Sequence, residues 1–77
     1  MKLVDCRGMK CPMPIVQIRL ALNHLGKGDE VMIYADDPTF SQEFLRFCYL
    51  ADLKCITRTI VNEASTSYET YHAKLLR

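Results

Sequence analysis

Cys11 is the residue of this chain best placed for covalent chemistry. It begins the tetrapeptide Cys11-Pro12-Met13-Pro14, directly before a segment of helical periodicity, and Arg7 and Lys10 lie close to it in sequence. The positive end of a helix dipole and nearby cations favour the thiolate of a cysteine over the thiol. Because the thiolate is the nucleophile, and because a less basic sulfur leaves more easily, Cys11 is predicted to accept a group and to pass it on.

The two prolines of the tetrapeptide are expected to shape the start of the helix. Proline fixes φ and has no N–H, so Pro12 and Pro14 remove two donors that a helix N-terminus normally presents, and the amides of Met13 and Ile15 remain. We expect a stiff turn that holds the sulfur of Cys11 away from the body of the protein. The competing interpretation is that Cys11 is a small, buried and inert apolar residue.

The other cysteines have simpler interpretations. Cys48 lies on the apolar stripe of a predicted helix and is assigned to the core, and Cys55, at the start of a predicted strand, is also expected to be structural. Cys6 and Cys11 are separated by four residues, which leaves open a redox pair in which Cys6 is the resolving thiol. No metal site is expected, because the cysteines, His24 and His72 lack the usual ligand spacing.

Composition limits the classes of function. A chain of 77 residues with 49% hydrophobic and 25% charged residues is expected to form one globular domain, residues 1–77. The net charge of +1 gives no field for nucleic acid or anionic lipid, so Tyr49, Tyr68 and Tyr71 are interpreted as packing residues. No signal peptide or membrane span is recognised, so we expect a cytoplasmic protein with free thiols.

The hydrophobic pattern predicts six elements. Strands are expected over residues 2–6, 30–35, 55–61 and 67–75, the last two joined by a loop over 62–66. A first helix should run from the Cys-Pro-Met-Pro segment to a stop at Gly26, and a second should begin with Asp37 as N-cap and Pro38 at its first position. Their apolar stripes are Ile15, Ile18, Leu22 and Leu25 in the first and Phe40, Phe44, Phe47, Cys48 and Ala51 in the second.

The order β-α-β-α-β-β predicts an α+β fold. Two helices with one apolar stripe each can cover one face of a four-stranded mixed sheet, giving a two-layer α/β sandwich. Asp36 and Asp37 are interpreted as helix-capping residues rather than as paired acid–base carboxylates.

With these residues identified, the chain resembles the TusA/SirA-type sulfur-carrier family, known for a Cys-Pro-x-Pro motif at the start of its first helix. The similarity covers nearly the whole chain. It is carried by Val4-Asp5-Cys6-Arg7-Gly8-Met9-Lys10, Cys11-Pro12-Met13-Pro14, Arg19, Ala35-Asp36-Asp37-Pro38 and Phe47-Cys48.

The resemblance implies a persulfide carried on Cys11. It implies a cysteine desulfurase or another persulfide donor as one partner and a downstream sulfur-relay protein as the other, in tRNA thiolation, sulfur oxidation or molybdenum-cofactor supply. No bound cofactor and no direct contact with nucleic acid are expected. The residues expected to support Cys11 are Pro12, Pro14, Arg7, Lys10, Arg19 and Cys6.

Two positions differ from the family's usual pattern. Met13 stands between the prolines where the best-known thiouridine-pathway members have glutamate, and Cys6 stands where a small or apolar residue is more usual. Both positions flank the reactive sulfur, so the donor and the acceptor stay open. The alternatives are a redox or regulatory module using Cys6 and Cys11 and, ranked last, a nucleic-acid-binding module.

Overall fold

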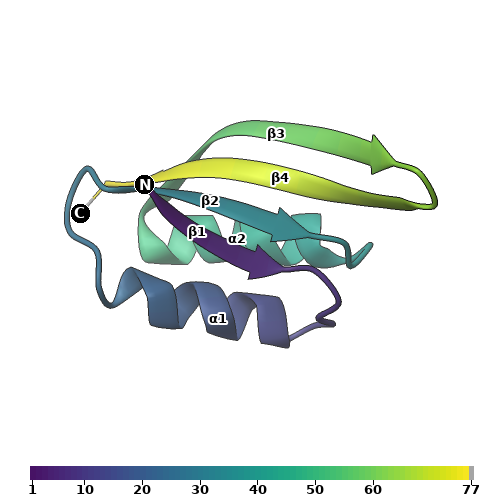
Figure 1. Ribbon diagram of the computed structural model, residues 1–77. Coiled ribbons are helices and arrows are strands. Elements are labelled where there is room, and N and C mark those ends of the chain that lie inside the picture. The colour runs from purple at the N-terminus through teal and green to yellow at the C-terminus, as the bar shows by residue number, and fades with distance from the viewer. Residues whose placement is uncertain (77) are drawn as a thin grey trace.

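The computed structural model describes residues 1–76, in which the elements follow the order β-α-β-α-β-β (Figure 1). The elements are β1 (Lys2–Cys6), α1 (Met13–Leu22), β2 (Glu30–Ala35), α2 (Phe40–Ala51), β3 (Leu53–Glu63) and β4 (Thr66–Leu75). Within these residues no helix has the length and apolar character needed to cross a membrane.

The four strands form one mixed sheet in the order β1-β2-β4-β3. β1 and β2 are parallel, while β4 is antiparallel to both β2 and β3. Both helices pack on the same face of the sheet, and the other face is open (Figure 1). The predicted α+β sandwich is therefore confirmed.

The core lies between the sheet and the helices. In β2 the buried residues Val31, Ile33 and Ala35 alternate with half-buried ones, as expected for a strand with one covered face. From α2, Phe40 and Phe44 pack against the ring of Tyr71 in β4, with ring centroids 5.2 and 5.0 Å from that of Tyr71. The predicted apolar stripe of the second helix is therefore its buried face.

The first helix ends earlier than predicted. Its last residue is Leu22 rather than a residue next to Gly26. The N–H groups of His24 and Leu25 donate to the carbonyl oxygens of Ala21 and Leu22, three residues back, so the chain leaves the α-helix through tighter turns. The prediction failed because the apolar period continues to Leu25 although the helical hydrogen bonding does not.

The second helix begins later than predicted, at Phe40 with Thr39 as its N-cap. Asp37 does not cap the helix, because its Oδ1 accepts the backbone N–H and the hydroxyl of Thr39 at 3.0 Å in a turn that precedes it. Pro38 lies within this turn and outside the helix.

The C-terminal hairpin is longer than predicted. β3 and β4 pair as far as Glu63 and Thr66, so the expected loop over 62–66 contracts to a turn at Ala64 and Ser65. Ala64 has a φ of 45°, which places the tip of the turn in the left-handed region. At the other end, β3 begins at Leu53, directly after Asp52, the left-handed C-cap of α2 with φ 56°.

Candidate active site

Cys11 lies directly before α1 and is exposed. The peptide bond between Cys11 and Pro12 is cis. The residue lines a shallow hollow between the two helices, together with Pro14, Ile15, Asp37, Phe40 and Glu43. An accessible thiol on a shallow surface can react with a group presented by another protein, but the hollow is too small to enclose a substrate.

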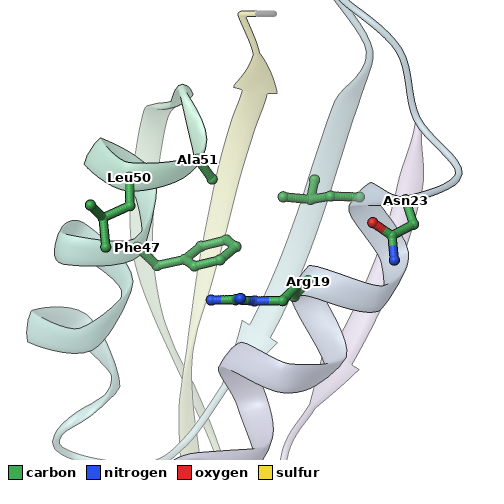
Figure 2. Close-up of a pocket in the computed structure, with 6 residues that line it drawn as sticks. Arg19, Asn23, Phe47, Leu50 and Ala51 are labelled. Carbon is green, nitrogen blue, oxygen red and sulfur yellow. The ribbon is translucent and has the colours of Figure 1, made fainter.

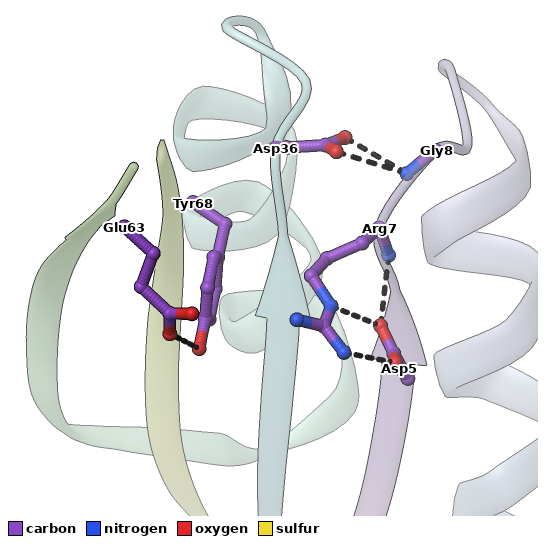
Figure 3. A network of polar contacts seen from close by, with 6 residues as sticks. All are labelled: Asp5, Arg7, Gly8, Asp36, Glu63 and Tyr68. Atoms are coloured by element: carbon purple, nitrogen blue, oxygen red, sulfur yellow. Dashed lines mark hydrogen bonds and ion pairs between the residues drawn. The ribbon is translucent and has the colours of Figure 1, made fainter. Parts of the chain in front are cut away.

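The backbone around Cys11 is held by two aspartates at the end of β2. The N–H of Cys11 donates to Oδ2 of Asp37 at 2.8 Å. The N–H of Gly8 donates to both carboxylate oxygens of Asp36 at 3.0 Å (Figure 3). Parallel pairing of β1 with β2 brings the ends of both strands to one edge of the sheet, which explains the contact. The sequence interpretation treated these aspartates as capping residues and so missed their role in holding the loop.

The charge of Asp37 is stabilised by the same contacts. The N–H groups of Thr39 and Cys11 and the hydroxyl of Thr39 donate to its carboxylate, and Lys10 adds a positive charge, so the pKa of Asp37 lies below its ordinary value. The charge of Lys10 therefore acts on Asp37, which is bonded to the amide of Cys11.

One free amide donor remains at the start of α1. The N–H of Met13 donates to the carbonyl of Lys10 at 2.9 Å, which removes one of the two donors expected from the sequence. Pro12 and Pro14 have none to offer. Among residues 1–76, the N–H of Ile15 has no backbone or side-chain acceptor outside its own helix, so it remains an available donor.

Arg7 does not have the surroundings expected of a cation beside the sulfur. Its guanidinium forms two hydrogen bonds with the carboxylate of Asp5, at 3.0 and 2.8 Å (Figure 3). The guanidinium also lies over the rings of Tyr34 and Tyr68. This pairing with Arg7 lowers the pKa of Asp5. The sequence could not show that a residue near Cys11 in the chain turns toward the strands.

Cys6 is packed beneath the start of α1. It is 0% exposed, and its Sγ lies 3.8 Å from the carbonyl oxygen of Pro14, to which it donates. Burial raises the pKa of Cys6 to about 11, with a smaller contribution from the charge of Asp5. A neutral, inaccessible thiol is a poor nucleophile and a poor resolving group, so these surroundings count against a redox pair with Cys11.

The remaining cysteines agree with their structural assignments. Cys48 is buried on α2, and burial raises its pKa to about 12. Cys55 is half-buried against the core, and burial raises its pKa as well. Among residues 1–76, no group of three or more His, Cys, Asp or Glu side chains is arranged to hold a metal ion.

Arg19 lies away from Cys11, in a groove between the two helices. It follows the first residue of α1 by six positions, about 9 Å along the helix axis. Its guanidinium lies 5.6 Å from the ring centroid of Phe47, and Asn23, Leu50 and Ala51 also line the groove (Figure 2). The structure therefore separates Arg19 from the other residues predicted to support Cys11.

The sequence matches the protein-family model described as sulfurtransferase TusA over residues 2–69. The chain belongs to the TusA family. This match supports a sulfur-carrier role, and membership of the family implies an exchange of sulfur with donor and acceptor proteins.

A solved structure has the same fold. A SirA-like protein from Desulfitobacterium hafniense has a TM-score of 0.72 against this chain, with 19% sequence identity and coverage of 100% of both chains. The likeness confirms the two-layer architecture of the TusA family member described here.

Proposed function

We propose that this protein carries sulfane sulfur as a persulfide on Cys11, taking it from one partner protein and passing it to another. The observation that carries the proposal is the position of Cys11, an exposed thiol at the start of α1 in a chain of the TusA family. Every other cysteine is buried or half-buried.

The first step is the uptake of sulfur. The thiolate of Cys11 attacks the outer sulfur of a donor persulfide, and a new S–S bond forms between Sγ and that sulfur. The donor's own S–S bond breaks, and its electron pair leaves on the donor sulfur as a thiolate. The proton of the outer sulfur travels with it or is lost to water, and no net oxidation occurs.

The second step repeats this chemistry with the roles reversed. A thiolate of the acceptor protein attacks the outer sulfur of the Cys11 persulfide, and Cys11 leaves as a thiolate. The N–H of Ile15 and the positive end of the α1 dipole stabilise that leaving charge. Pro12 and Pro14 stiffen the turn, and Asp37 holds the amide of Cys11 in place.

The partners are proposed from this chemistry. The hollow at Cys11 is too shallow to enclose a free small substrate, which favours a cysteine desulfurase or another persulfide protein as the sulfur donor and a relay protein as the acceptor. The end product is a thiolated tRNA or another sulfur-containing product. The relay is proposed to work in the cytoplasm, where reducing conditions keep the carrier thiol free.

The test is intact-protein mass spectrometry after incubation with a cysteine desulfurase and cysteine. The wild-type protein should gain the mass of one sulfur atom, and a reductant should remove it. Cys11→Ser should fold normally and gain nothing, because its side chain is exposed and contributes little to packing.

Cys55→Ser is the matched control, since Cys55 is the other cysteine with a partly accessible side chain. It should gain sulfur as the wild type does. Sulfur uptake that survives in Cys11→Ser would contradict the proposal, and loss of two hydrogens under mild oxidant without sulfur gain would favour a Cys6–Cys11 redox pair instead.

A further inference from the structure

Arg7 is the centre of a group of contacts that the sulfur chemistry does not itself require. Its Cζ lies 5.1 Å from the ring centroid of Tyr34 and 4.7 Å from that of Tyr68, so the guanidinium is in contact range of both rings. Asp5 binds the same guanidinium in a bidentate pair, and the hydroxyl of Tyr68 donates to Glu63 (Figure 3). The cluster connects β1 to the three other strands.

This cluster lies on the open face of the sheet. Val4 and Cys6 of β1 point into the core, so Asp5 between them points to the opposite side. Tyr34 lies between the buried Ile33 and Ala35 and pairs in register with Asp5. The guanidinium of Arg7 therefore anchors the end of β1 on the face opposite the helices.

The chain between Arg7 and Cys11 is short and is tied at several points. After Arg7, the N–H of Gly8 is bound by Asp36, the N–H of Met9 donates to the carbonyl of Cys6 at 3.2 Å, and the N–H of Cys11 is bound by Asp37. Gly8 has a φ of 82°, a conformation suited to glycine, which turns the chain from the open face toward α1. A displacement of Arg7 would therefore be transmitted to Cys11.

We propose that Arg7 is a positioning residue for sulfur transfer, which acts from the open face of the sheet by holding residues 7–11 so that the sulfur of Cys11 is presented at a fixed place. This inference rests on the proposed function of Cys11. It differs from a direct electrostatic role, because the guanidinium is engaged by Asp5 and the two tyrosine rings.

The decisive variant is Arg7→Leu. It should lower the rate constant for sulfur uptake by about tenfold or more. Moving a reacting atom by about 1 Å can lower a reaction rate by up to about a hundredfold. The amide proton resonances of Gly8 and Cys11 in NMR spectra should also shift, because their hydrogen bonds to Asp36 and Asp37 loosen. Arg7→Lys should restore part of the rate, because it keeps the charge near the rings but not the bidentate pair with Asp5.

Arg58→Leu is the matched control. Arg58 is also paired with a carboxylate, that of Glu69, and lies 5.8 Å from the ring centroid of Tyr71, but it is not attached to residues 7–11. This variant should leave both the rate and the two amide resonances unchanged. If Arg7→Leu does not fold, Tyr34→Leu is the second variant. It removes one of the two rings that contact Arg7 and should also slow sulfur uptake.

The results distinguish a positioning role of Arg7 from a direct contact with a partner protein and from failure of the carrier function. A slower rate with shifted amide resonances supports positioning. A normal rate in folded Arg7→Leu or Tyr34→Leu overturns it, and so does a slower rate with unchanged resonances, which would mean that Arg7 contacts a partner instead. Sulfur uptake by Cys11→Ser would overturn the carrier function itself, whatever the Arg7 variants do.

Discussion

At the scale of single residues, two cysteines five positions apart have opposite surroundings. Cys6 is the last residue of β1 and points into the core, whereas Cys11 follows the turn at Gly8 and is exposed. The distinction arises because a strand fixes the face that each side chain occupies, while the turn releases the chain from that face. The accessibility of each thiol is therefore set by its position in the fold and not by residue type.

Asp37 gives a prediction at this scale. Its folded-state pKa lies below the ordinary value of 3.8, so its contribution to stability is present above that pH and is lost as the pH falls through the folded pKa. The amide proton resonance of Cys11, followed by NMR against pH, should move with a midpoint below 3.8.

In Asp37→Asn this movement should disappear, because the amide side chain does not titrate. Asp36→Asn should retain it, since Asp36 holds Gly8 and not Cys11. A Cys11 resonance that titrates unchanged in Asp37→Asn would show that Asp37 is not the group responsible.

At the scale of elements, α2 supplies much of the aromatic core. Phe40 and Phe44 stack on each other with ring centroids 5.2 Å apart, and both form T-shaped contacts with the ring of Tyr71. Burial of large aromatic side chains is a major source of stability in a domain this small. The helix therefore stabilises the sheet whose strand β2 ends directly before Asp36 and Asp37, the two residues that hold the loop carrying Cys11.

Phe44→Ala should destabilise the protein by about 3–5 kcal/mol, because Phe44 is 0% exposed and its loss leaves a cavity. Such a loss is a large part of a typical stability of about 5–15 kcal/mol. Urea denaturation would measure the change. Tyr49→Ala is the matched control on the same helix, since Tyr49 is 86% exposed, and it should change stability by about 0.5 kcal/mol or less. Equal effects would contradict the assigned buried face.

At the scale of the whole molecule, the two layers divide the four thiols by accessibility. Cys6 of β1 and Cys48 of α2 are buried between the two layers, Cys55 is half-buried, and Cys11 lies outside the core. Access to the first two therefore requires the layers to separate, which in a small cooperative domain means global unfolding.

A small alkylating reagent should label Cys11 first and Cys55 more slowly. Cys6 and Cys48 should react together, at a rate that rises with urea in the same way for both, because the same unfolding exposes them. Mass spectrometry of digested samples over time would follow each site. Early labelling of Cys6 alone would show local opening beneath α1 and would revive its role as a partner of Cys11.

The sequence by itself determined the order of elements, the apolar faces of both helices and the sandwich, because these depend on periodicity within short segments. It also singled out Cys11, since the signal of a thiol at a proline-containing helix start is local. Element ends were less predictable, as α1 and α2 show, because turns such as that of Asp37 and Thr39 compete with the helix.

Only the tertiary structure decided which distant residues meet at the site. Parallel pairing of β1 with β2 brought Asp36 and Asp37 to the loop that carries Cys11 and brought Tyr34 to Arg7. Antiparallel pairing of β2 with β4 added Tyr68. Burial of Cys6 likewise follows from the packing of α1 over β1. These contacts join residues as much as 61 positions apart, from Arg7 to Tyr68, and depend on strand pairing and helix packing that no local pattern encodes.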